Sequence, residues 1–304
     1  MLTKPQQTWN TLSKQFWANK NKALFFGASG AAGGAFGSMI GEIVMAGNQR
    51  GLATSFIDSI GLIIRVGIWF GLAGASISIA LLLGYYWYLN KQFRPRQVFQ
   101  EGTLPGCLAG ILAGAIAQVI YGISPNELLR VVCWGIAGGL LGLGLSFKIR
   151  NLGKWRGLFG GILGGMIGGC LFILFTFLTG EVAGRFFGLA AIGFFIGLMI
   201  ILVEAVFRDA WLVVHWSPTE QKTLSLGREA ILLGSSDRAQ IYLPKQQGYP
   251  SVTAQLYARE KEVILQFYPD YARDRKMQKS TQILKDGDRR QFGNLILEVK
   301  ISRS

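Results

Sequence analysis

The stretch from residue 23 to residue 207 constrains this chain more than any other feature, because it consists of six apolar runs with few charges inside them. Runs of about 20 such residues are long enough to cross the hydrocarbon core of a bilayer. All but five of the 41 glycines also lie here. The pattern therefore predicts an all-α polytopic membrane domain of six helices. We place the spans near residues 23–46, 59–84, 104–123, 128–147, 157–178 and 183–207.

The basic residues that flank the spans are distributed unequally between the two sides. Eleven lie in the leading segment and in the loops after the second and fourth spans, whereas the opposite loops carry only Arg50 and three arginines just inside the spans. Because basic loops stay in the cytoplasm, we expect both termini there. The net charge of +14 follows from this arrangement. We therefore expect the lipid bilayer as a partner, in a prokaryotic inner membrane, and no nucleic acid.

Residues 1–22 precede the first span and have a different pattern. Trp9, Phe16 and Trp17 recur at helical spacing among lysines. This pattern is typical of an amphipathic helix that lies on a bilayer surface. We predict an interfacial segment over residues 1–22.

The spans repeat as three tandem glycine-rich hairpins. Each even-numbered span begins with one arginine and has a glycine eight or nine residues later, at Gly74, Gly138 and Gly193. The first and fifth spans also match, with Gly27 aligned to Gly161. Glycines four residues apart let helix backbones approach closely. The predicted packing glycines are Gly30, Gly34, Gly110, Gly114, Gly135, Gly139, Gly161 and Gly165.

The three arginines of the repeat lie near the outer ends of their spans, where an arginine must pair or reach the interface. Spacings of three and four residues place Glu127 beside Arg130 and Glu181 beside Arg185. We expect Glu42 to face Arg65. Two interpretations stay open. The charges either anchor the outer interface as ion pairs, or form a ring of arginines around an anion-attracting vestibule.

No known catalytic pattern is present. The sequence has no Walker A loop, zinc-ligand spacing or serine-nucleophile elbow. Cys107, Cys133 and Cys170 fall inside apolar runs and are interpreted as packing residues. His215 lies between Trp211 and Trp216 and is interpreted as an interfacial side chain. We therefore expect no enzyme, no catalytic residues, no metal and no cofactor.

The composition changes after Phe207. Residues 208–218 are aromatic and basic and are interpreted as a linker that leaves the membrane. From residue 219 to residue 304, short β runs alternate with turn residues. This pattern predicts a small all-β sandwich.

Two segments of this region resemble the forkhead-associated (FHA) family. Residues 231–243, Ile-Leu-Leu-Gly-Ser-Ser-Asp-Arg-Ala-Gln-Ile-Tyr-Leu, resemble the early strands of the family. Residues 284–293, which include Asp286-Gly287-Asp288, look like its Leu-x-Asp-Gly-Asp-x-Ile-x-x-Gly segment. The resemblance implies an eleven-stranded sandwich whose loops bind phosphothreonine peptides. The corresponding loop residues here are Gly234, Ser235, Arg238, Ser251 and Thr253.

The phosphate-binding residues of the family match poorly. Ser235 stands where the family has an arginine, and only Ser251 remains of its Ser-Arg-x-His turn. Without that arginine, the charge-assisted hydrogen bonds that select phosphate are missing. The resemblance therefore implies a degenerate FHA-like fold that docks a cytoplasmic protein partner without depending on phosphate.

Two functions follow from these patterns. The sequence favours an integral membrane protein that presents a cytoplasmic FHA-like interaction module, as a scaffold or signalling adaptor. The alternative is a channel or transport protein whose membrane domain is regulated by the tail, and a homo-oligomer stays open.

Overall fold

The computed structural model describes two compact units, a helical unit and a β-sandwich. The described residues are 4–45, 56–89, 95–124, 126–149, 151–217, 220–236, 239–259 and 262–302, and the side chains of 4–18, 45 and 56–59 are outside this description.

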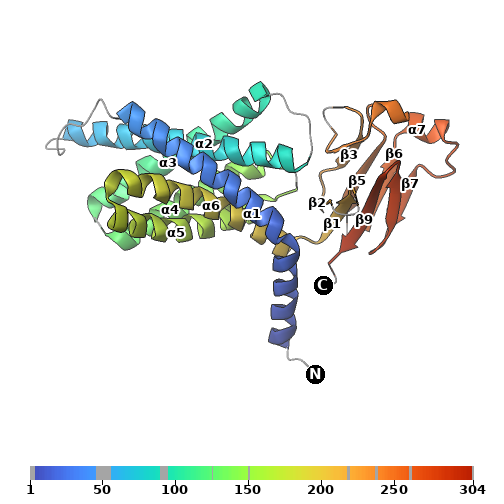
Figure 1. Cartoon of the computed structure of the whole chain (residues 1–304), viewed down its shortest axis with the longest axis horizontal. Helices are drawn as coiled ribbons and strands as arrows, with labels where there is room; N and C mark the ends of the chain where they lie inside the picture. Colours follow the sequence, from blue (N-terminus) through green and yellow to red (C-terminus); the bar gives the residue numbers. More distant parts are fainter. Residues whose placement is uncertain are drawn as a thin grey trace. The chain divides into compact units, whose positions relative to one another are not determined.

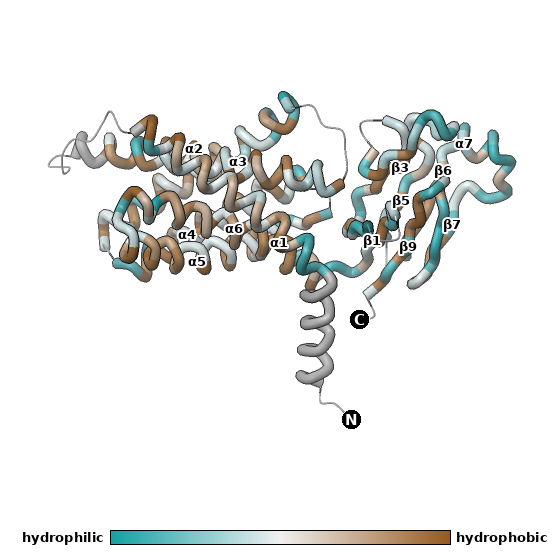
Figure 2. Tube along the Cα trace, in the orientation of Figure 1, coloured by the Kyte–Doolittle hydropathy of each residue, from teal (hydrophilic) through white to brown (hydrophobic). Residues whose placement is uncertain are grey.

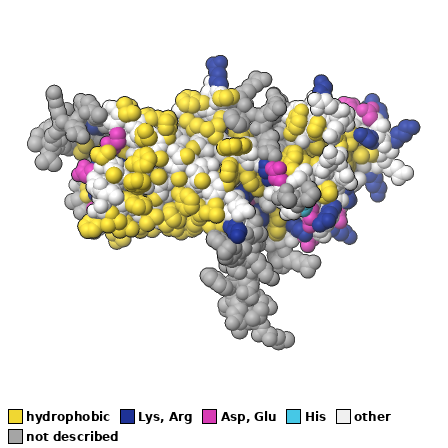
Figure 3. Space-filling view, in the orientation of Figure 1, with side chains coloured by type: hydrophobic (Ala, Val, Ile, Leu, Met, Phe, Trp, Pro, Cys, Tyr) yellow, Lys and Arg dark blue, Asp and Glu magenta, His cyan; other side chains and the backbone are white. Residues whose placement is uncertain are grey.

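Six long helices form the helical unit (Figure 1). Their bounds are α1 Lys4–Met45, α2 Phe56–Tyr88, α3 Pro95–Ile123, α4 Glu127–Ser146, α5 Lys154–Thr179 and α6 Glu181–Phe207. Each contains a segment long and apolar enough to cross a membrane. Apolar residues run along all six helices (Figure 2), and apolar side chains cover much of the visible surface of the unit (Figure 3). The six predicted spans are confirmed, and the chain is a multi-pass membrane protein.

Two helix starts differ from the predicted spans. Helix α3 begins at Pro95, nine residues before the predicted start of the third span at residue 104, and Pro105 lies inside it. Proline is well tolerated in the first turn of a helix, so Pro95 is as suitable a start as Pro105. Helix α1 runs without a break from Lys4 into the first span. The side chains of 4–18 are outside the described residues, so the interfacial position of this segment stays a prediction.

The helices close into a ring. Close contacts join each helix to the next and join α6 back to α1. In ring order the contacting pairs are Gly33–Ile77, Gly74–Gly106, Pro105–Gly144, Gly138–Gly161, Gly168–Ile192 and Gly193–Gly30.

Three of these contacts are equivalent and join glycine to glycine. They are Gly74–Gly106, Gly138–Gly161 and Gly193–Gly30, and in each pair a Cβ on either glycine would overlap the carbonyl oxygen of the other. Each pair includes the glycine that follows a repeat arginine by eight or nine residues. The tightest packing therefore lies between neighbouring hairpins of the repeat. By these contacts Gly30 is the equivalent of Gly161, so the sequence alignment of Gly27 with Gly161 is wrong by three residues.

The other predicted packing glycines also lie at helix contacts. Gly34 meets Leu189 of α6, and Gly165 meets Trp134 of α4. Gly110 and Gly114 both pack on Phe70 of α2, while Gly135 and Gly139 meet Met166 and Ile162 of α5. Such close approaches replace in lipid the hydrophobic driving force that water provides.

The second unit is a β-sandwich of two sheets (Figure 1). Its strands are β1 Ala210–His215, β2 Gln221–Leu226, β3 Ile231–Gly234, β4 Ile241–Tyr242, β5 Ala254–Arg259, β6 Glu262–Phe267, β7 Thr281–Leu284, β8 Arg289–Phe292 and β9 Leu295–Ile301. The sheet orders are β2-β1-β9-β8 and β4-β3-β5-β6-β7. Two short helices, η1 Lys245–Gln247 and α7 Pro269–Asp274, lie in its loops. The predicted all-β architecture is confirmed, with nine strands in the described residues where the FHA resemblance implied eleven.

The predicted linker over residues 208–218 is wrong. Strand β1 occupies most of it and lies between β2 and β9. Ala210, Leu212 and Val214 alternate into the sandwich core. Because Trp211 and Trp216 are typical of a membrane interface, the sequence favoured a segment that leaves the membrane. The alternation of buried and half-buried residues is instead that of a central strand. His215, interpreted as an interfacial side chain, belongs to this strand, and its Nε2 lies 3.3 Å from a carboxylate oxygen of Glu298 on β9.

Candidate functional site

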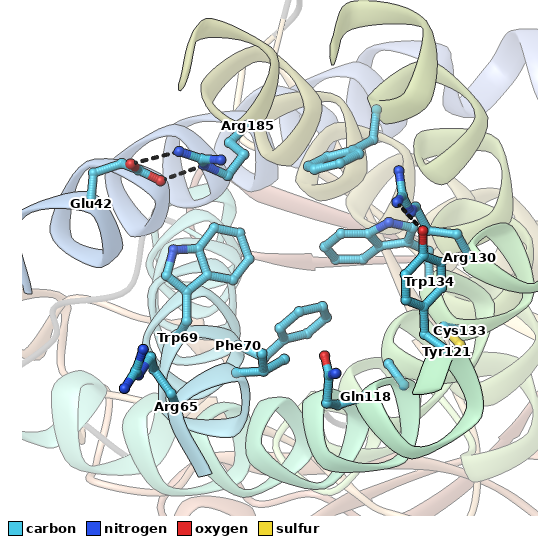
Figure 4. A pocket seen from close by; sticks show the side chains of 13 residues that line it. Glu42, Arg65, Trp69, Phe70, Gln118, Tyr121, Arg130, Cys133, Trp134 and Arg185 are labelled. Carbon is cyan, nitrogen blue, oxygen red and sulfur yellow. Dashed lines mark hydrogen bonds and ion pairs between the residues drawn. The ribbon is translucent and has the colours of Figure 1, made fainter. Parts of the chain in front are cut away.

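A cavity of about 610 Å³ opens at the end of the ring that carries the repeat arginines. Side chains from all six helices line it, which places it inside the ring (Figure 4). The lining residues are Glu42, Arg65, Val66, Trp69, Phe70, Ala117, Gln118, Tyr121, Arg130, Cys133, Trp134, Phe172 and Arg185. The structure thus brings the three predicted arginines and Glu42 to one cavity.

Arg185 is held by two carboxylates. Its Nε and Nη2 donate to the two oxygens of Glu42 at 2.7 and 3.0 Å, which joins α6 to α1 (Figure 4). Its Nη1 donates to Glu181 at 3.4 Å. The ion pair between Glu181 and Arg185, which was predicted from their spacing of four residues, is therefore present. Glu42 was expected to face Arg65, and it forms its bidentate pair with Arg185 because α6 packs on α1.

Arg130 is positioned by its own helix and by α3. Its Nη1 lies 3.0 Å from Glu127, as the spacing predicted. Its Nη2 donates to the hydroxyl of Tyr121 at 2.9 Å, and the guanidinium lies 5.0 Å from the centre of that ring. Glu127 and Glu181 are largely exposed, at 57% and 85%, and do not line the cavity.

Arg65 lies across the cavity from Arg130 (Figure 4). Aromatic rings form much of the wall between them. Phe70 stacks on Trp134 with ring centres 4.9 Å apart, and Phe172 lies 5.1 Å from Trp134. Gln118 of α3, which sequence reasoning treated as a packing amide, directs its side chain into the cavity (Figure 4).

The interior of the helical unit is tightly packed away from the cavity. Ile77 and Leu81 of α2, Leu141 of α4 and Ile196 of α6 are buried there, each at most 5% exposed. The cavity therefore ends in packed apolar side chains.

A charged pair at the opposite end of the ring was missed by sequence reasoning. Nζ of Lys22 on α1 lies 3.5 Å from Glu204 on α6, and the two side chains are only 12% and 4% exposed. The sequence offered one sign of this pair. Glu204 is the single carboxylate in the last turn of the sixth span, at the end of the spans where Lys22 also lies. The pair joins α1 and α6 a second time, far from Glu42 and Arg185 in sequence.

Two of the predicted loops of the sandwich lie side by side. Ser235 N donates to Pro250 O at 3.0 Å, and Ser236 N donates to Ser251 O at 3.2 Å. A Cβ at Gly234 would overlap the carbonyl oxygen of Ser251, so this contact requires glycine. Three of the predicted loop residues, Gly234, Ser235 and Ser251, are thus brought together.

Of the other two predicted loop residues, the structure describes only Thr253. Thr253 is fully buried, and its hydroxyl has no hydrogen-bond partner in the described structure. It cannot contact a docked protein, so its assignment to the binding loops is wrong. Its burial follows from its place at the start of β5, where it pairs with Leu233 and Tyr268 through the backbone. Arg238 lies outside the described residues.

The segment between β6 and β7 lies at the same end of the five-stranded sheet. Tyr268 N donates to Thr253 O, and Phe267 N donates to Ser280 O. This segment contains α7 and four exposed basic side chains, Arg273, Arg275, Lys276 and Lys279. We call residues 235–236, 249–253 and 268–280 the loop end of the sandwich.

Tyrosines stabilise the loop end from within. Tyr249 stacks on Tyr271 of α7 with ring centres 6.1 Å apart, and Tyr271 stacks on Phe267 at 6.0 Å. Burial raises the pKa of Tyr249 above its ordinary value, and the nearby Tyr271 adds to this while Arg275 opposes it. The basic segment is therefore anchored on the sheet by aromatic packing.

Within the described ranges, no three or more His, Cys, Asp or Glu side chains gather as metal ligands. No protein-family model matches the chain. No curated protein matches it either.

A solved structure is among those similar to part of the chain. It comes from a structural and functional analysis of phosphothreonine-dependent FHA domain interactions. The match has 15% identity and a TM-score of 0.26, and it covers 32% of this chain and 100% of the solved one.

Proposed function

We propose that this multi-pass membrane protein is a scaffold or signalling adaptor, whose β-sandwich docks a cytoplasmic protein through the loop end. The observation that carries the proposal is the convergence of three separate segments at that end. Residues 235–236, residues 250–253 and Tyr268 come from different loops, and backbone hydrogen bonds tie the first and the third to the second. Loops held rigidly on a sheet are the usual place for a binding surface.

The charge of the loop end supports an acidic partner segment. Arg273, Arg275, Lys276 and Lys279 lie within seven residues and are all exposed, and they outnumber the two exposed carboxylates of the segment, Asp270 and Asp274. Complementary charge speeds association and selects partners. Because Ser235 occupies the place of the family's arginine, we propose that binding does not require a phosphate.

The basic loops of the membrane domain support a cytoplasmic position for the sandwich, as the positive-inside rule requires. We propose a prokaryotic inner membrane as its location. We also propose that the protein has no enzymatic activity of its own.

The test compares two charge-reversal variants of the full-length protein in native membranes. One variant, Arg273→Glu/Arg275→Glu/Lys276→Glu, alters the loop end. Its control, Arg228→Glu/Arg259→Glu/Lys285→Glu, alters exposed residues at the other end of the sheet, where β5, β6 and β7 pair through Ala258, Val263 and Leu284.

After crosslinking in the membrane and purification, bound proteins are quantified by mass spectrometry. We expect the loop-end variant to lose at least nine-tenths of a specific partner that the control retains. Phosphatase treatment before crosslinking should leave that partner bound. Equal recovery of all proteins with both variants would refute docking at the loop end.

A further inference from the structure

We infer that the cavity inside the helical ring binds an amphipathic anion, meaning a carboxylate or phosphate group carried on an apolar body. This site is independent of the docking proposed for the sandwich. Its volume of about 610 Å³ lies within the range of small-molecule sites, which is roughly 300–1,000 Å³. All six helices contribute to its wall, so the ring as a whole encloses it.

The charges on the wall favour an anion. The charged lining residues are three arginines and one glutamate. Glu42 is already engaged by Nε and Nη2 of Arg185, which neutralises that side of the cavity. The other charged groups of the lining are the guanidinium groups of Arg65 and Arg130, each of which also has an interaction within the protein.

Arg130 is held in place for such a role. The hydroxyl of Tyr121 accepts from its Nη2 at 2.9 Å, and the ring of Tyr121 lies beneath the guanidinium. Its carboxylate partner Glu127 is 57% exposed, so water screens that pair. Beside an apolar wall, the attraction between Arg130 and an anion is less screened than in water.

The rest of the wall favours an apolar body. Trp69, Phe70, Trp134 and Phe172 present aromatic surface, with Phe70 stacked on Trp134 and Phe172 tilted against it. Trp134 and Phe172 are only 6% and 8% exposed, so this part of the wall is largely shielded from solvent. A bare inorganic anion would leave this surface unused, and a neutral lipid would leave the arginines unused.

Gln118 lies between the two parts of the wall. Its amide points into the cavity from α3 (Figure 4). An amide can donate to an anionic oxygen while its carbonyl accepts from a neighbouring arginine. This position fixes where the head group ends and the apolar body begins.

Two sources supply this chemistry, a free fatty acid and an anionic phospholipid of the bilayer. The test titrates the full-length protein in neutral detergent and counts adducts by native mass spectrometry. The probes are palmitate against hexadecanol, and phosphatidylglycerol against phosphatidylcholine. We expect one saturable adduct per chain, at least tenfold tighter for the anionic member of a pair. Adducts of palmitate alone identify a fatty acid, and adducts of phosphatidylglycerol alone identify a bilayer lipid.

The double variant Arg65→Gln/Arg130→Gln should weaken the anionic adduct at least tenfold. Its charge-matched control is Arg96→Gln/Lys148→Gln, two exposed residues outside the cavity, and should bind as the unaltered protein does. A second variant, Ala117→Phe, fills the cavity without changing charge and should also abolish the adduct. It decides the test if the arginine variant fails to fold, as judged by gel filtration. Equal binding of hexadecanol and palmitate together with equal binding of the two phospholipids, or unchanged binding in both cavity variants, would overturn the inference.

Discussion

At the residue scale, two charge pairs near the ends of the spans join different helices. Glu42 and Arg185 are 143 positions apart, and Lys22 and Glu204 are 182 positions apart. Both pairs join α1 to α6, one near each end of the ring. A charge inside a span is costly unless it is paired, so each pair favours the closed ring over an open row of hairpins.

The Glu42–Arg185 pair can be tested by removing one partner. We expect Arg185→Gln to destabilise the helical unit by about 1–3 kcal/mol, because the partly buried Glu42 carboxylate loses two hydrogen bonds. Unfolding in mixed detergent micelles, followed by circular dichroism, measures the loss. The double variant Glu42→Gln/Arg185→Gln should recover part of it. Glu181→Gln is the control, and its effect should stay within about 0.5 kcal/mol because that carboxylate is 85% exposed.

A second residue-scale prediction concerns Glu298 in the sandwich. Its carboxylate accepts from Lys300 and from Arg289, and these partners lower its pKa below the ordinary value of 4.5 despite its burial. A lowered pKa in the folded state stabilises the fold above the ordinary pKa, and this contribution is lost as the pH falls through the folded pKa.

We therefore expect the thermal midpoint of the sandwich to fall as the pH drops below about 4.5, and Glu298→Gln to make this decline shallower. Scanning fluorimetry of the full-length protein between neutral and acidic pH measures both. Glu262→Gln, an exposed position on β6, is the control and should follow the unaltered protein. An unchanged slope with Glu298→Gln would show that other carboxylates govern the acid response.

At the element scale, three glycine pairs set the distance between neighbouring hairpins. In each pair the backbones touch, so any side chain must push the helices apart. We expect Gly138→Leu to destabilise the helical unit by about 3 kcal/mol or more, since overpacking alone costs about 1–3 kcal/mol and here the obstacle is backbone. Gly74→Leu and Gly193→Leu should have similar effects because their contacts are equivalent.

The matched control for this series is Gly122→Leu on α3, where an added Cβ meets nothing within 4 Å. Thermal unfolding in detergent and the yield of monodisperse protein compare the four variants. If Gly122→Leu is as harmful as Gly138→Leu, the close approach of α4 and α5 does not explain the result.

At the scale of the whole molecule, the prediction concerns orientation. In a variant without Cys107, Cys133 and Cys170, single cysteines are placed at Lys148 and Thr179, at opposite ends of the hairpins. We expect an impermeant maleimide to label Thr179→Cys in intact cells and Lys148→Cys only after permeabilisation, because basic loops stay cytoplasmic. Lys276→Cys in the sandwich should behave like Lys148→Cys. The reverse pattern would place the loop end outside the cytoplasm.

Much of the architecture was predictable because its signals are local. The six spans follow from apolar length, and the sandwich follows from short alternating runs with turns. The partner of Glu42 was not predictable, since it depends on which helix closes the ring. Strand β1 was not predicted because Trp211 and Trp216 are also typical of a membrane interface. The cavity was only partly predictable, because the arginines repeat visibly in the sequence whereas Gln118 and Phe172 carry no such pattern.

The sequence by itself determined that this chain crosses a membrane six times, that its four-residue glycine rows lie at helix contacts and that a β-sandwich follows. These properties depend on bilayer thickness, on the missing side chain of glycine and on the period of a strand, which act over a few neighbouring residues. Only the tertiary structure decided that α6 closes on α1, that Arg185 takes Glu42, that Thr253 is buried and that aromatic side chains surround a cavity between the arginines. Those outcomes depend on how distant segments fill space together, and no local pattern encodes that choice.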